Sequence, residues 1–343
     1  MLNKKKKSCN IQRNQGIEIL RMFLCFRIVL LHCYSSHNRF INKLRRNYYQ
    51  VPCFFFLSFI FLYPTILKRN IDKMKLRLKR LSIPYIIYPI IFWFVNNIMF
   101  LLFQFNIFKR FLTLNELKMH IIIGEGIRDL SILWFLFQLQ ILTIIFFICK
   151  LLLKNNFLSI FQIISLFCYL ITYTGINYNF FIHYTNRIFT SIGNFVEAMP
   201  IAITAFSLSK INFIQIISSH KMKIIFFFSF FFYLILEYNI FSPIKGMSSP
   251  GFKPLIISVL LFSIFSLISL DYKNSKVLIS ISQMTKYTKG IYCMHKIVLS
   301  YLKYYYGNNV TFLGCIIIYI ICYFISFIGF QIFSKSELRF LFI

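Results

Sequence analysis

The sequence lacks any polar stretch long enough to form a separate soluble domain, which excludes a soluble globular protein. Acidic residues are scarce: nine Asp and Glu stand against 38 Lys and Arg, giving a formal net charge of +29. No small-residue cleavage site follows the first apolar run, so we expect a retained first span rather than a signal peptide. No internal repeat stands out, which weakens the case for a transporter built from inverted repeats.

The excess of positive charge does not indicate a nucleic-acid partner. Lys and Arg gather in short loops between apolar runs, as the topology of membrane proteins requires. The nine cysteines lack the spacing of metal ligands, and most lie inside apolar runs. We therefore predict no metal site, no bound cofactor and no nucleic acid, and we interpret most cysteines as small buried hydrophobes.

Apolar runs fill the chain, which is 343 residues long, 58% hydrophobic and rich in Phe. Runs of about twenty residues recur, each long enough to cross a hydrocarbon core of about 30 Å. The pattern predicts an all-α, polytopic transmembrane helix bundle of about ten spans. The predicted spans are 17–36, 51–67, 83–103, 131–149, 157–174, 188–209, 222–242, 253–270, 288–306 and 310–333.

These spans predict a single integral-membrane domain. It comprises a basic tail at 1–16, the bundle at 17–333 and a short tail at 334–343. More than half of the Lys and Arg fall on one side of the predicted membrane, most clearly in residues 68–80. This bias places the N-terminus and the C-terminus in the cytoplasm, although the basic loop at 39–46 argues mildly for the opposite orientation.

The first span carries two ionisable residues, Arg21 and His32, eleven positions apart. At 100° per residue this is about three turns, so they share one helix face and are separated by roughly 16 Å along the axis. Glu18 precedes Arg21 by three positions and can neutralise it on the same face. One face of this span is therefore polar from its inner end to well inside the bundle. Arg27 points elsewhere, and we interpret it as pairing or packing.

His32 has two interpretations. A neutral imidazole accepts a proton from a hydroxyl near neutral pH, which suits general-base catalysis. Polar side chains in helix bundles also hydrogen-bond neighbouring spans, and a lone histidine can do only that. The face shared with Arg21 and Glu18 favours a functional role, because intramembrane ionisable groups are costly and usually face a cavity.

Two further stretches carry polar groups near the second and third spans. Arg77 and Arg80 lie side by side on a helical start, which forms a fork for phosphate oxygens. The alternative is that this basic loop only fixes topology and attracts anionic lipid. Ser58 follows an aromatic run in the second span, where a serine often just bonds the preceding turn or a neighbouring helix.

Later spans add four candidates. Tyr292 and His295 are three positions apart in the ninth span and share a face, although His295 can equally be a packed histidine. Glu197 lies midway along the sixth span and is either a proton carrier or the partner of a basic group. Trp134 opens the fourth span at its outer side, where an interfacial tryptophan is expected in any case.

Taken together, the chain resembles the acyltransferase-3 family, ten-span bacterial membrane O-acyltransferases that modify surface polysaccharides. The resemblance covers residues 16–333 and follows the family's motif order. Its five pieces are the arginine–ten residues–histidine motif of Arg21 and His32, the stretch Pro52–Ser58, the R-x-x-R of Arg77 and Arg80 with Ile83-Pro84-Tyr85, the Leu-Trp-Phe-Leu of 133–136, and the Tyr-x-x-His of Tyr292 and His295. The chain departs from the family at Phe59, where the family usually has glycine after the serine.

The resemblance implies transfer of an acyl group, expected to be acetyl, from acyl-CoA as co-substrate to a sugar hydroxyl. The acceptor would be a surface glycan or a lipid-linked glycan, and the setting the bacterial inner membrane and its lipid. It implies that His32 is the catalytic base. Arg21, the second catalytic candidate, either holds the pantetheine or phosphate portion of the donor or stabilises developing oxyanion charge, and its place near the inner end of the span favours donor positioning. Arg77 and Arg80 would hold the CoA phosphates, and the remaining candidates would support the acceptor site.

Two other classes compete with this interpretation. A transporter or flippase for a glycan or acyl donor would line a cavity with charges but would need no base at His32. A glycan polymerase would be expected to carry a large, arginine-rich outer loop. The outer loop at 104–130 is short and mixed in charge, so we rank the polymerase last.

Overall fold

The structure is a computed structural model, and it is helical, with no strand in the part of the chain that it describes. The described residues are 15–32, 49–103, 112–124, 133–173, 187–211, 252–271, 275–306 and 310–343, with 213, 216, 219, 222–225, 227–229 and 231. The all-α prediction is therefore confirmed. Most of the predicted span 222–242 lies outside the described residues.

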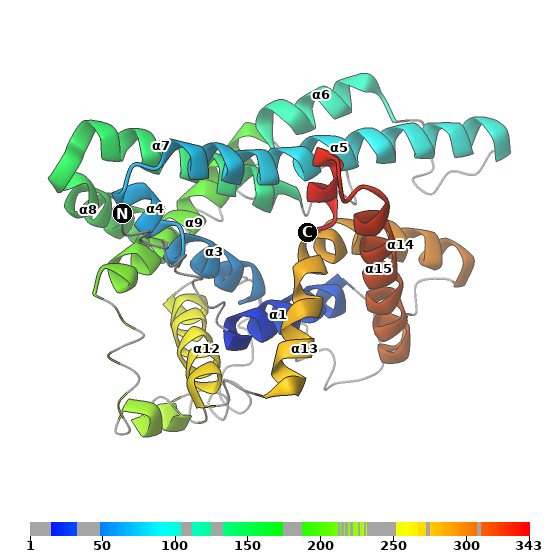
Figure 1. Cartoon of the computed structure of the whole chain (residues 1–343). Coiled ribbons are helices and arrows are strands. Elements are labelled where there is room, and N and C mark those ends of the chain that lie inside the picture. Colours follow the sequence, from blue (N-terminus) through cyan, green and yellow to red (C-terminus); the bar gives the residue numbers. More distant parts are fainter. Residues whose placement is uncertain are drawn as a thin grey trace, which may run out of the picture.

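The helices follow the predicted apolar runs closely (Figure 1). In the first half they are α1 (Gln15–His32), α3 (Gln50–Ile60), α4 (Tyr63–Leu67), α5 (Ile71–Phe103), α6 (Leu114–Ile123), α7 (Trp134–Leu153) and η2 (Lys154–Asn156). In the second half they are α8 (Phe157–Tyr173), α9 (Arg187–Lys210), α12 (Phe252–Asp271), α13 (Lys276–Met284), η4 (Thr285–Tyr287), α14 (Thr288–Tyr306), α15 (Phe312–Ile332) and η5 (Glu337–Leu341).

Helices of this kind cross membranes. Within the described residues, five stretches are long and apolar enough to do so: Gln50–Leu67, Ile71–Ile98, Trp134–Thr172, Thr190–Lys210 and Phe312–Ile332. The longest of them contains two helices, α7 and α8, joined by η2. The chain is thus a multi-pass membrane protein, while the count of ten spans stays a prediction.

Two boundaries differ from those expected. The basic stretch before the third predicted span is not a loop, because α5 begins at Ile71 and runs without a break through Pro84 and Pro89. The outer loop contains a helix, α6. There Thr113 and Glu116 form a capping box, in which each side chain accepts a hydrogen bond from the backbone N–H of the other. Gly124 ends α6 in a left-handed conformation, φ 77°.

Helix α1 lies at the centre of the packing. It contacts α3, α12, α13, α14 and α15, which surround it below the long helix α5 (Figure 1). On the other side of α3, α9 packs against α3 and α8, and α7 packs against α5. The central position of α1 explains how its polar residues are kept away from lipid.

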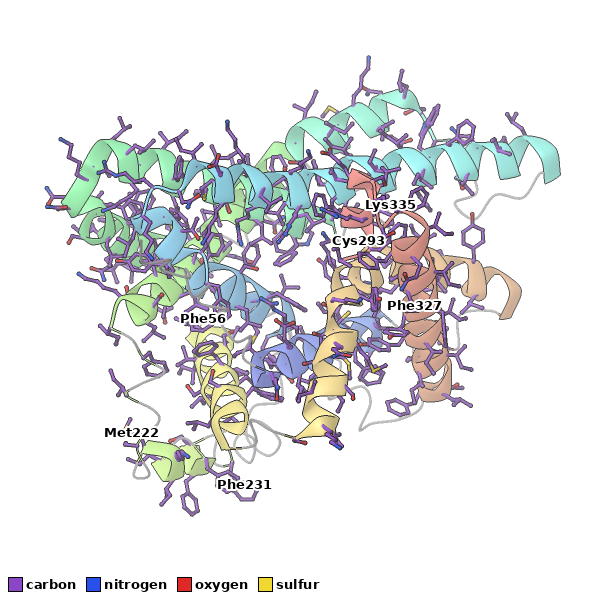
Figure 2. The ribbon with its side chains drawn as sticks, in the orientation of Figure 1. Phe56, Met222, Phe231, Cys293, Phe327 and Lys335 are labelled. Atoms are coloured by element: carbon purple, nitrogen blue, oxygen red, sulfur yellow. The ribbon has the colours of Figure 1, made fainter. Side chains whose placement is uncertain are left out.

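The outer surface is apolar, as a lipid-facing surface must be, because no water is present there to solvate polar groups. Large hydrophobic side chains stay exposed along α5, α8 and α15. Figure 2 labels one of them, Phe327 on α15, and also labels the fully buried Cys293 on α14. Large hydrophobic side chains are thus found both in the interior of the bundle and on its outer surface, as in a membrane protein and unlike a soluble one.

Candidate active site

The N-terminal end of α1 is held by a buried carboxylate, Glu18. Arg21 Nη1 donates a hydrogen bond to Glu18 Oε1 at 2.9 Å, and Thr285 Oγ1 donates to the second carboxylate oxygen at 2.8 Å. Glu18 therefore neutralises Arg21, as the sequence predicted, and also ties η4 to α1. The predicted polar face of α1 is thus anchored to the segment that precedes α14.

A cavity of about 370 Å³ opens beside this carboxylate. It brings together four of the predicted residues, which come from four different helices: Arg21, Ser58, Arg80 and Tyr292. The complete lining is Glu18, Arg21, Phe54, Ser58, Arg80, Leu81, Phe135, Leu136, Leu139, Thr285, Lys286, Thr288, Lys289, Tyr292 and Ile343.

One part of the cavity wall is strongly basic. Arg21, Arg80, Lys286 and Lys289 line it, and among the lining residues that the structure describes Glu18 is the only acidic side chain. Lys289 Nζ also donates to the backbone oxygen of Arg80 at 3.1 Å, which joins α14 to α5. Several cations around one small volume favour a ligand with more than one negative charge.

The rest of the lining is largely apolar and comes mainly from α3 and α7. Phe54 meets Phe135 edge to face, with ring centroids 6.1 Å apart, and Leu136 and Leu139 continue the surface. Tyr292 completes it, with its ring 5.5 Å from that of Phe135. A lining that combines basic and apolar side chains suits a molecule that has a charged head and an uncharged arm.

Beyond Tyr292 the structure brings the two predicted histidines together. The rings of His32 and His295 stack with centroids 5.3 Å apart and planes inclined by 30°, although the residues are 263 positions apart in the chain. Tyr292 connects this histidine pair to the cavity, because it lines the cavity and its ring is 6.1 Å from that of His295. Neither histidine lines the cavity itself.

The hydrogen bonding of His295 assigns its tautomer. Nδ1 lies 2.7 Å from the backbone oxygen of Tyr292, which can only accept, so Nδ1 carries the proton. Nε2 consequently holds a lone pair. It is buried and has no hydrogen-bond partner among the residues that the structure describes. His295 therefore presents an acceptor atom inside the bundle, next to His32.

Arg77 and Arg80 occupy different surroundings, although they are three residues apart on α5. Arg80 is exposed and lines the cavity, whereas Arg77 is half-buried and does not. Arg77 Nε donates to Thr143 Oγ1 at 3.4 Å, and its guanidinium lies 6.0 Å from the centroid of the Phe59 ring. Of the predicted pair, Arg80 alone lines the cavity, where it joins Arg21.

Phe59 is fully buried in an aromatic cluster. Its ring meets Phe146 and Phe206 edge to face, at centroid distances of 5.5 and 5.8 Å, and stacks on Phe55. Helices α3, α7 and α9 therefore accommodate the bulk that a glycine would not have. Phe59 also supplies the ring under Arg77.

The other predicted residues lie away from the cavity. Trp134 is half-buried beside Phe55, at a centroid distance of 6.0 Å. Because α5 and α7 are antiparallel, with Ser82 bonded to Gln140, Trp134 lies level with the middle of α5 rather than beside its end. Glu197 is half-buried on α9. Arg27 packs over Tyr49, with Cζ 5.6 Å from the ring centroid.

Sequence reasoning missed Lys286 and Lys289. They were counted only as charges that fix the membrane orientation. Lys286 lies in η4 and Lys289 in the first turn of α14, and both line the cavity. The threonines beside them, Thr285 and Thr288, were also missed. The sequence T-K-Y-T-K at 285–289 could have indicated them, because its two lysines and its two threonines are each three positions apart and so share a helix face. Within the described ranges, no three His, Cys, Asp or Glu side chains are grouped so that they could hold a metal ion.

The chain was compared with known protein families, curated proteins and solved structures. The family model Acyl_transf_3, described as an acyltransferase domain, matches residues 14–334. No curated protein and no solved structure matches the chain.

Proposed function

The chain belongs to the acyltransferase-3 family, whose model covers nearly all of it, and we propose that it moves an acetyl group from acetyl-CoA to a sugar hydroxyl of a cell-surface glycan. One observation carries this proposal. Arg21 of α1 and Arg80 of α5 are distant in sequence, and they line one basic cavity whose Tyr292 adjoins the histidine pair.

The cavity walls support acyl-CoA as the donor. Arg21, Arg80, Lys286 and Lys289 would hold its phosphates, since charge-assisted hydrogen bonds to phosphate are among the strongest in proteins. The apolar wall of Phe54, Phe135 and the leucines of α7 would receive its uncharged arm. In this arrangement the thioester at the end of the arm points toward Tyr292 and the histidines.

His32 would serve as the base. It removes the proton of the sugar hydroxyl, the oxygen attacks the thioester carbonyl carbon, and the carbon–sulfur bond then breaks. The thiolate leaves and takes up a proton, so that the products are free CoA and the ester. His295 Nε2 would accept a hydrogen bond from the incoming acceptor, and the stacked rings would fix the position of His32.

We also propose the cytoplasmic membrane of a bacterium as the location, with both termini in the cytoplasm. Acyl-CoA is a cytoplasmic molecule, and the cavity is lined by residues near the N-terminal ends of α1, α5 and α14, which the charge bias assigns to that side. The acceptor would then reach the histidines from the opposite side of the bundle.

Release of free CoA separates an enzyme from a transporter. Purified protein in detergent, given acetyl-CoA labelled in the acetyl group and a membrane fraction containing glycan, should release CoA thiol and label the glycan in equal amounts. His32→Ala protein of equal purity is the control and should do neither. The same protein reconstituted in sealed vesicles gives the contrary outcome: movement of label across the membrane without release of free thiol would show a transporter and contradict the proposal.

A further inference from the structure

After α15 the chain folds back across the bundle in a short stretch, η5 together with Phe342 and Ile343, which we name the return segment. Its aromatic and aliphatic side chains are buried: Phe340, Leu341 and Phe342 are 3%, 4% and 9% exposed. The sequence predicted only a tail here. The structure instead packs the return segment against α5 and α15 (Figure 1, red).

Two glycines make room for the return segment. A Cβ on Gly329 of α15 would overlap the ring of Phe342, and a Cβ on Gly290 of α14 would lie 3.1 Å from the Phe342 backbone. Tyr88 of α5 adds a hydrogen bond from its hydroxyl to the Leu341 backbone oxygen, 2.9 Å long. Three helices therefore fix the position of the return segment.

The return segment reaches the basic wall of the cavity. Two guanidinium groups lie over the Phe340 ring: Arg80, with Cζ 5.5 Å from the ring centroid, and Arg339 of the return segment itself, with Cζ at 5.2 Å. Lys79 forms an ion pair with Glu337. Ile343 lines the cavity beside Arg80 and Lys289. The backbone of Arg80 is held from the other side by the bond from Lys289.

We propose that Phe340 is a positioning residue for Arg80 and that the return segment is one wall of the anion-binding part of the donor site. This inference rests on the proposed function. An arginine on an exposed helix face samples many rotamers, and a buried ring beneath the guanidinium limits them. A guanidinium held over the ring can still use its N–H groups to bind phosphate oxygens of the donor.

The test compares Phe340→Leu with Phe340→Tyr in the full chain. The measurements are the KM for acetyl-CoA, kcat, and the Kd of CoA by titration calorimetry. Loss of the cation–π contact should raise KM and Kd about two- to fivefold in Phe340→Leu and leave kcat unchanged. Phe340→Tyr keeps a ring and should retain the wild-type values. Phe340→Met, close to Phe in size, serves if Phe340→Leu does not accumulate.

Phe333→Leu is the matched control. The Phe333 ring stacks on Phe342 at 6.0 Å, so this variant loosens the same packing without touching Arg80, and KM and Kd should not change. In an Arg80→Ala background, Phe340→Leu should have no further effect on Kd. Additive effects, or equal effects of Phe333→Leu and Phe340→Leu, would overturn the inference. If the wild-type protein neither binds CoA nor uses acetyl-CoA, the proposed function itself fails.

Discussion

The histidine pair is the residue-scale feature on which the proposed chemistry depends. His32 comes from α1 and His295 from α14, and their rings stack with centroids 5.3 Å apart. Ionisable groups inside a membrane bundle are costly and therefore usually serve a function. The hydrogen bond from His295 Nδ1 to the Tyr292 backbone oxygen also fixes the orientation of the His295 ring. The arrangement suits a base that must meet an acceptor hydroxyl at one place.

We predict that His32→Ala and His295→Ala each lower kcat, by about 10²-fold or more for His32, while KM for acetyl-CoA stays unchanged. Because the two side chains act together, the double variant should be no slower than His32→Ala alone. Steady-state assays with labelled acetyl-CoA measure this. Multiplicative losses in the double variant would show that the histidines work independently.

Phe59 yields a prediction that runs against the family pattern. Replacing it with the family's glycine, Phe59→Gly, removes a fully buried ring from contact with Phe146 and Phe206. The resulting cavity should cost about 3–5 kcal/mol, and thermal unfolding in detergent should show a lower Tm. Phe324→Gly, on the exposed face of α15, is the control for the effect of glycine in a helix and should cost about 1 kcal/mol. Equal Tm values for the two variants would contradict this account of Phe59.

At the scale of elements, periodicity and apolar length predicted nearly every helix, because both are local properties of the chain. The start of α5 was missed because its first turns are basic, and basic residues were read as a loop. The return segment was missed for a different reason. Its burial depends on the space above Gly290 and Gly329, which only the packing of α14 against α15 creates.

The two glycines give the prediction at this scale. Gly329→Ala places a methyl group where the Phe342 ring lies, so the return segment should shift and the Tm should fall. In a Phe342→Ala background, Gly329→Ala should lower the Tm less than it does in the wild type, because the ring that the methyl group would meet is absent. Thermal unfolding of the three variants measures the coupling. Strict additivity would show that Gly329 and Phe342 do not share the space.

At the scale of the whole molecule, many of the residues at the cavity and in the histidine pair could be predicted from the sequence, but their contacts with one another could not. Motif order identified Arg21, Arg80, Tyr292 and His295, whereas spacing along one helix could not show that His32 lies against α14. Sequence also treated Arg77 and Arg80 alike, and only the fold separates a cavity residue from one packed on Phe59. Long-range packing decides such questions, and a single sequence does not display it.

The assembled molecule joins a basic cavity at one end of α1 to a histidine at the other. A donor held by its phosphates and an acceptor held by the histidines would therefore react inside the bundle, across the length of one helix. Other membrane proteins with charged cavities could bind the same donor, so the reaction itself is the central claim.

The O-acetyl content of the surface glycan tests that claim most directly. We would measure it by mass spectrometry in cells that express the wild-type chain or His32→Ala at equal protein levels. The account predicts acetylated sugars with the wild type and their loss with His32→Ala. Unchanged acetylation with normal levels of the His32→Ala protein would contradict it.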